Sequence, residues 1–76
     1  MSKEGLMTLV TAPMAGNVLT VAVNVGDNVE EDETVVVMEA MKMEVPIVAP
    51  ASGVIKEIRV TPGQMVESDA VLAVIE

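Results

Sequence analysis

The chain has 76 residues and a formal net charge of −8, and it contains no cysteine, histidine or aromatic residue. This composition predicts one small domain without disulfides, and it excludes zinc sites and nucleophilic catalysis that depend on Cys or His. The negative charge argues against nucleic acid and anionic membrane surfaces as partners. No apolar run approaches the roughly 20 residues of a spanning helix, and no signal-peptide core follows the N-terminus. We therefore expect a soluble, cytoplasmic protein without direct membrane insertion.

Valine-rich segments predict an all-β fold, because β-branched residues favour strands over helices. Residues 1–6 are expected to form a flexible N-terminus. Strand character begins at Met7 and leads through Leu9 and Val10 to Pro13, which has no N–H for a ladder and so belongs at a strand end or edge. A second strand is predicted over residues 18–23.

Two turns and a loop follow from composition. Gly16-Asn17 and Gly26-Asp27-Asn28 are predicted turns, since glycine and asparagine tolerate the backbone angles that turns require. The acidic segment Glu30–Glu33 is predicted to be a solvated loop.

Residues 34–48 are predicted to form a hairpin. Thr34–Met38 is a β-branched run, and the same character resumes over residues 44–48, interrupted at Pro46. Met41 and Lys42 would then lie at the tip. Two-residue hairpin turns favour Asn-Gly or Asp-Gly because they need positive φ. A Met-Lys tip opposes that preference, and such conflicts indicate functional positions.

The chain contains an internal repeat: residues 12–39 match residues 49–76 at a shift of 37 positions without a gap. Two short β units that cannot bury a hydrophobic face alone must pack against each other, which predicts a flattened barrel or sandwich with pseudo-two-fold symmetry. The shift places both termini at the end of the molecule opposite Lys42. The identical positions include Ala12-Pro13 with Ala49-Pro50, Gly16 with Gly53, Val23 with Val60, Gly26 with Gly63, Val29-Glu30 with Val66-Glu67, Asp32 with Asp69, and Val37 with Val74.

The tip segment Glu39-Ala40-Met41-Lys42-Met43-Glu44 resembles the biotin-attachment motif of biotinyl (biotin carboxyl carrier) domains, members of the biotin/lipoyl attachment family. The resemblance extends over most of the chain. It implies a single biotinyl domain over residues 7–76, folded as a barrel-sandwich hybrid of two four-stranded antiparallel sheets. The gap-free repeat leaves no room for the inserted thumb of some bacterial carriers, so the thumbless type is expected. The other segments that resemble the family are 12–16, 26–29, 49–53 and 62–66.

The resemblance implies that Lys42 carries biotin through an amide, and that the domain moves a carboxyl group between active sites of a biotin-dependent carboxylase, decarboxylase or transcarboxylase. The expected partners are a biotin protein ligase, a biotin carboxylase, and carboxyltransferase or decarboxylase subunits. Only about one lysine in a few thousand is neutral and nucleophilic at pH 7, so the ligase would have to supply an activated biotin. The residues that the ligase and partners would recognise are Glu39, Ala40, Met41, Met43 and Glu44.

The sequence shows no nucleophile–base pair and no phosphate-cradling glycine loop, which predicts a carrier rather than an enzyme. A lipoyl carrier is one alternative, although lipoyl domains usually have Asp-Lys-Ala at the tip. An unmodified structural or interaction module is another. Met41 and Met43 either cap the barrel end or point outward, because a tight turn would disturb the alternation of an extended strand. Lys3 and Lys56 are expected to be solvated charges.

Overall fold

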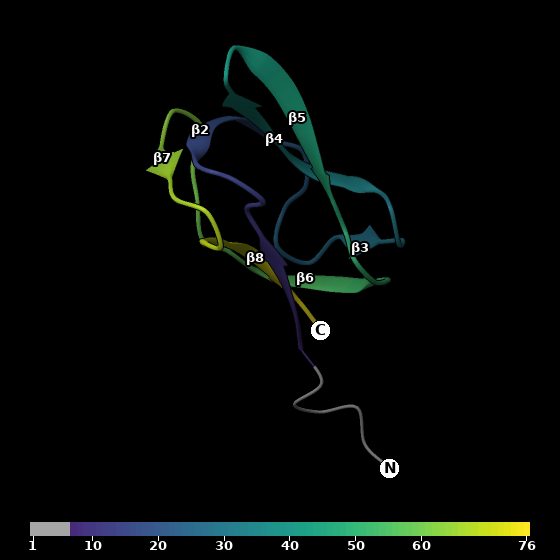
Figure 1. Cartoon of the computed structure of the whole chain (residues 1–76). Helices are drawn as coiled ribbons and strands as arrows, with labels where there is room; N and C mark the ends of the chain where they lie inside the picture. The colour runs from purple at the N-terminus through teal and green to yellow at the C-terminus, as the bar shows by residue number, and fades with distance from the viewer. Residues whose placement is uncertain (1–6) are drawn as a thin grey trace.

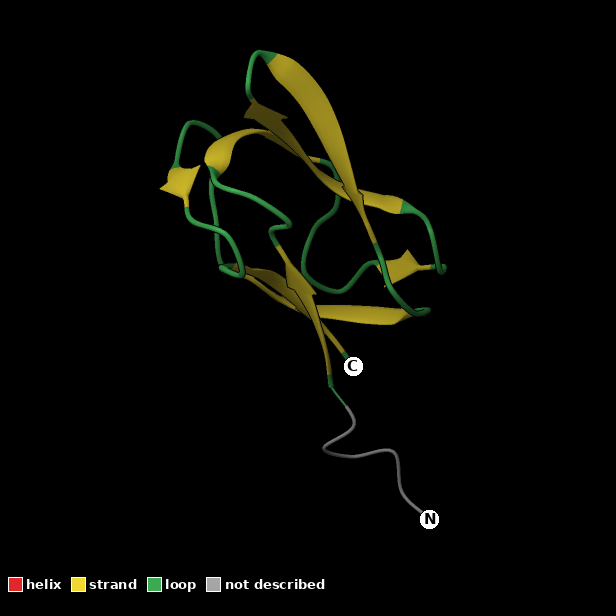
Figure 2. Ribbon diagram, in the orientation of Figure 1, coloured by secondary structure: helices red, strands yellow, loops and turns green. Residues whose placement is uncertain are grey.

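The computed structural model describes residues 7–76, so the expectation for residues 1–6 lies outside its range. Within that range every regular element is a strand, which confirms the all-β prediction (Figures 1 and 2). The strands are β1 Thr8–Thr11, β2 Gly16–Val21, β3 Asn28–Val29, β4 Thr34–Ala40, β5 Met43–Val48, β6 Gly53–Ile58, β7 Met65–Val66 and β8 Val71–Ile75. Residues 7–76 form no helix, and therefore no helix long and apolar enough to cross a membrane.

The strands form two four-stranded sheets, with the orders β1-β8-β6-β3 and β5-β4-β2-β7. All the pairings are antiparallel, as predicted. The two sheets face each other across the molecule, with the β4–β5 hairpin projecting from one end (Figure 1). The chain passes back and forth between the two sheets through connections of four to six residues.

The predicted pseudo-two-fold symmetry is confirmed by the strands and by their hydrogen bonds. The 37-residue shift carries β2 onto β6 and β3 onto β7, and it converts the order of one sheet into the order of the other. The Gly26 N–H donates to the carbonyl of Ile55 at 2.8 Å, and the matched Gly63 N–H donates to the carbonyl of Val18 at 2.7 Å. The two halves therefore repeat the same backbone interactions without an insertion, as expected for the thumbless type.

An aliphatic core fills the space between the sheets. No polar or charged residue is buried within residues 7–76, so the core contains no side chain that needs an internal hydrogen-bond partner. Each fully buried side chain of this kind stabilises the fold by about 1.5–3 kcal/mol relative to exposure. The largest fully buried side chains include Met38, Ile55, Leu72 and Ile75, and Met38 and Ile75 are partners under the 37-residue shift.

The glycines serve two different purposes. Gly26 and Gly63 have φ of 96° and 90°, so they occupy turns that other residues rarely adopt. The turn predicted at Gly16-Asn17 is wrong, because Gly16 begins β2, and its partner Gly53 begins β6. A Cβ at Gly16 would lie 2.5 Å from the carbonyl oxygen of Glu39. Gly16 is thus required by a close approach of two strands and not by a turn.

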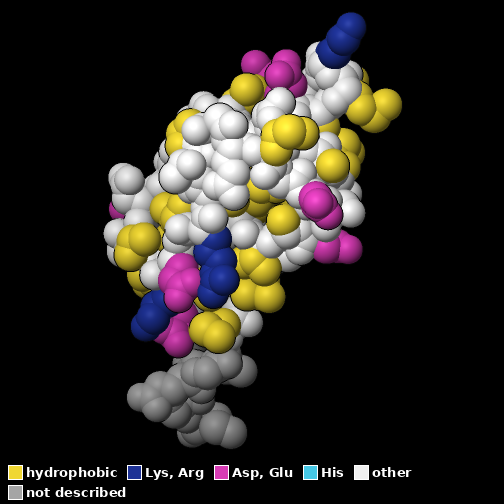
Figure 3. All heavy atoms as spheres, turned by 90° about the vertical axis from the view of Figure 1, so that its left-hand side faces the viewer, with side chains coloured by type: hydrophobic (Ala, Val, Ile, Leu, Met, Phe, Trp, Pro, Cys, Tyr) yellow, Lys and Arg dark blue, Asp and Glu magenta, His cyan; other side chains and the backbone are white. Residues whose placement is uncertain are grey.

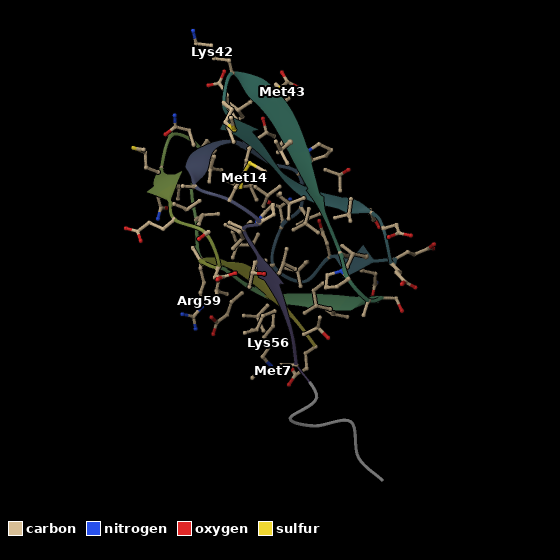
Figure 4. All side chains as sticks on the ribbon, viewed as in Figure 1. Met7, Met14, Lys42, Met43, Lys56 and Arg59 are labelled. Carbon is tan, nitrogen blue, oxygen red and sulfur yellow. The ribbon has the colours of Figure 1, made fainter. Side chains whose placement is uncertain are left out.

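Strand positions within the two sheets explain why β5 tolerates a proline and why the two ends of the described chain lie together. The predicted interruption at Pro46 is wrong: β5 continues through this residue, because β5 is an edge strand and needs no N–H on its free side. Thr8 pairs with Ile75, which brings the two ends of the described chain together. Met7 lies at the end of the molecule opposite Lys42 (Figure 4), and the predicted placement of the chain ends is confirmed for Met7 and Glu76.

Candidate functional site

The predicted hairpin is present, and its tip is the two-residue turn Met41-Lys42. Ala40 pairs with Met43 across the turn, and both turn residues have positive φ, at 54° and 66°. These signs match the turns that suit the right-handed twist of a hairpin. For residues with a side chain such a conformation is unfavourable by roughly 1–2 kcal/mol each. The turn is therefore held in place by the strands on either side of it.

The sequence of β4 explains why the hairpin projects from a rigid base. β4 lies between β5 and β2 in its sheet, and it buries residues up to the last position before the turn. Met38 is 0% exposed and Ala40 is 5% exposed. The burial ends abruptly at Met41. The hairpin is consequently anchored in the core through β4, while the turn itself lies outside the barrel.

The three residues around the tip are all exposed. Met41 is 87% exposed and Met43 is 67% exposed, so neither side chain caps the core. Lys42 is also exposed and lies at the extremity of the molecule (Figure 4). Within residues 7–76 the ion pairs are Lys56 with Glu76 and Arg59 with Glu57, so the Lys42 ammonium has no carboxylate partner there. Figure 3 shows the contrast: a basic side chain projects at the top of the view, whereas basic and acidic side chains lie next to each other near the bottom.

Two glutamates face each other just behind the turn. Glu39 and Glu44 are direct cross-strand partners, and both are exposed. Like charges in this position are destabilising, so the pair is not explained by the stability of the hairpin. The acidic segment Glu30–Glu33 is also exposed, as expected, and residues 7–76 include no cluster of acidic groups placed to hold a metal ion.

No sequence motif connects β2 and β7 with the tip, but both strands belong to the sheet that carries the hairpin. Asn17 of β2 pairs with Glu39 on one side and with Met65 of β7 on the other. Met65 is 73% exposed, so a third exposed methionine lies in the sheet that carries the hairpin. No local pattern in the sequence indicates that Met65 lies in this sheet, because its position depends on the pairing of β2 with β7, which is distant in the sequence.

This arrangement can be compared with known proteins. Residues 8–75 match the biotin/lipoyl family, described as "Biotin-requiring enzyme". The biotin/lipoyl attachment protein of Bacillus subtilis is 44% identical over 63 residues, covering 83% of this chain and 86% of that protein. The biotin carboxyl carrier protein of Streptococcus mutans is 49% identical over 57 residues, covering 75% of this chain and 44% of that protein. The chain belongs to the biotin/lipoyl family.

Solved structures agree in fold. The Kluyveromyces lactis urea carboxylase matches with a TM-score of 0.88 and 34% identity, covering 92% of this chain and 6% of that one. A single-chain, multi-domain long-chain acyl-CoA carboxylase matches with a TM-score of 0.87 and 31% identity, covering 97% and 8%. The chain thus spans most of one small relative, less than half of another and a small part of these carboxylases. Within the family, it is a carrier domain of the biotin type.

Proposed function

We propose that Lys42 is the covalent attachment point of biotin, and that this domain carries a carboxyl group between the active sites of a biotin-dependent carboxylase, decarboxylase or transcarboxylase. The observation that carries the proposal is a single exposed lysine at the tip of a projecting hairpin, inside a segment that resembles the family's attachment motif. Membership of the biotin/lipoyl family supports it. The proposal includes a cytoplasmic location.

The residues at the tip fit this cofactor. An amide requires a primary amine that another protein can reach, and Lys42 offers one that is exposed and free of ion pairs within residues 7–76. Biotin, when bound, accepts a carboxyl group and gives it up again. The narrow projecting hairpin allows Lys42 to enter an active site while the barrel stays outside. Tethering of this kind raises the local concentration of the carried group at each site.

Attachment requires a second protein in this proposal. The neutral Lys42 amine attacks the acyl carbon of a biotinyl-adenylate that a biotin protein ligase provides. A C–N amide bond forms, the bond from the acyl carbon to the phosphate oxygen breaks, AMP leaves with the bonding electrons, and the amine loses a proton to a base or to water. Because few lysines are neutral at pH 7, the ligase must also favour the uncharged amine.

The ligase and the carboxylase partners would contact the exposed residues around Lys42. Met41 and Met43 offer flexible apolar side chains, and Glu39 and Glu44 offer charge. Ala40 is buried, so in this proposal it contributes through the shape of the tip. The carboxyl acceptor belongs to the partner subunits.

The test is the intact mass of the apo domain after incubation with biotin, ATP and a biotin protein ligase. We expect one biotinyl increment, none for Lys42→Arg, and an unchanged increment for the control Lys56→Arg. No increment is expected without ligase. An increment that survives in Lys42→Arg would contradict the assignment of the site. A lipoyl increment with lipoate and a lipoate ligase, in place of the biotinyl one, would assign the domain as a lipoyl carrier, and no increment with either would indicate an unmodified module.

A further inference from the structure

We propose that Gly16 is a positioning residue for Lys42: its missing side chain lets β2 approach the end of β4 and so fixes how the Met41-Lys42 turn leaves the sheet. This inference rests on the proposed attachment of biotin to Lys42. Gly16 lies outside the attachment motif, and the turn that the sequence predicts at Gly16-Asn17 is replaced in the structure by the start of β2.

Space is the reason for glycine at this position. The φ of Gly16 lies outside the left-handed region, so its backbone conformation suits any residue. An added Cβ, however, would lie 2.5 Å from the Glu39 carbonyl oxygen, 3.2 Å from the Ala40 Cβ and 3.2 Å from the Met38 Cε. The first of these atoms belongs to the backbone, which cannot rotate out of the way. A side chain at Gly16 must therefore displace the end of β4.

The displaced segment connects directly to the turn. Ala40 is the last residue of β4, and it pairs with Met43, the first residue of β5. A shift of Glu39 and Ala40 therefore reaches both sides of the Met41-Lys42 turn. That turn already occupies positive φ at two residues with side chains. Since Lys42 has no ion pair within residues 7–76 to hold it, its position depends on the strands beneath it.

The symmetry of the barrel supplies a matched control. Gly53 is the partner of Gly16 under the 37-residue shift, and a Cβ there would lie 2.6 Å from the Ile75 Cγ2 and 2.9 Å from the Glu76 carbonyl oxygen. At both glycines an added Cβ would thus lie less than 3.0 Å from a backbone carbonyl oxygen, but Gly53 lies at the end of the molecule away from Lys42. Gly16→Ala and Gly53→Ala should thus disturb the fold to a similar extent, while only the first disturbs the tip.

The experiment measures ligase kinetics with the apo wild type and both alanine variants as the varied substrate, below their melting temperatures. We expect both variants to lose a similar amount in Tm. We expect kcat/KM for biotinylation to fall about tenfold for Gly16→Ala, mainly through KM, and less than about twofold for Gly53→Ala, because small misplacements of a reacting group are costly to rate. Amide NMR shifts should change over residues 38–44 in Gly16→Ala only.

Equal loss of kcat/KM in the two variants, or no loss in either, would overturn the proposal. If Gly16→Ala does not fold in buffer alone, all three proteins are compared at the same concentration of an osmolyte such as TMAO, which favours the folded state. A wild-type domain that is not biotinylated at all refutes the proposed function, whereas a labelled wild type with unaffected Gly16→Ala refutes only the positioning role.

Discussion

The two ends of this barrel are built alike and finished differently. At one end β4 continues through Met41-Lys42 into β5, and at the other the matching strands β8 and β1 come from opposite ends of the described chain and meet where Thr8 pairs with Ile75. The packing beneath both ends is equivalent: Gly16 faces Met38, and Gly53 faces Ile75. The comparison indicates that the repeat provides the same packing beneath both ends, and that the two ends differ in what lies beyond that packing.

The two ends of the barrel also differ in the side chains that they expose. The lysine-bearing end exposes Met41, Met43 and a pair of like charges, none of which stabilises the fold. The opposite end holds the ion pairs of Lys56 and Arg59, at 2.9 and 3.0 Å. Basic and acidic side chains thus pair with each other at the end away from Lys42, whereas two acidic side chains face each other next to Lys42. Four changes test this contrast, from the largest expected effect to the smallest.

The largest effect tests the equivalence of the packing beneath the two ends. Met38→Ala and Ile75→Ala should each lower the free energy of unfolding by about 2–5 kcal/mol, since both side chains are fully buried. This is a large fraction of the roughly 4–11 kcal/mol expected for a domain of this size. Urea unfolding followed by far-UV circular dichroism measures it, with the exposed Leu19→Ala as control. A large loss for one variant and almost none for the other would show that the two ends are not equivalent.

The second change concerns the turn itself. Met41→Asn should raise the free energy of unfolding by about 1 kcal/mol or less, because asparagine tolerates the positive φ of this position better than methionine. Biotinylation by the ligase should slow at the same time, because an exposed apolar contact is lost. Asp69→Asn is the matched control, since Asp69 has φ 68° and already suits that conformation. Greater stability with an unchanged rate of biotinylation would indicate that the ligase does not contact the Met41 side chain.

The sequence predicted much of this fold, for reasons that are local. The β-branched runs and the position of Met41-Lys42 between two strands are visible in short segments, and the 37-residue repeat is visible when residues 12–39 are compared with residues 49–76. The role of Gly16 was not predictable, because its cause is the carbonyl of Glu39, which comes close only when β2 and β4 pair. Pro46 was misjudged for a similar reason: whether a strand accepts proline depends on its place in the sheet. The exposure of Met41 and Met43 depends on turn geometry that alternation does not describe.

The third change removes the like-charge pair behind the turn. Glu44→Gln should raise the free energy of unfolding by about 0.2–1 kcal/mol, because Glu39 lies directly opposite on β4. The gain should shrink at high salt, since both carboxylates are exposed and screened. Urea unfolding at low and high salt tests this, with the exposed loop residue Glu31→Gln as control. A loss of stability would show that Glu44 makes a favourable interaction that outweighs the repulsion.

The smallest effect is expected at the opposite end. Glu76→Gln removes the ion pair between Glu76 and Lys56. The Lys56 side chain is 60% exposed and the Glu76 side chain is 33% exposed, so the change should lower the free energy of unfolding by no more than about 0.5 kcal/mol. A double-mutant cycle with Lys56→Ala isolates the pair from other effects. The backbone of Glu76 still exchanges hydrogen bonds with Val54, so the strand end stays in place. Biotinylation should be unchanged, and a slower rate would mean that this end of the molecule also contacts the ligase, against the division of roles between the two ends.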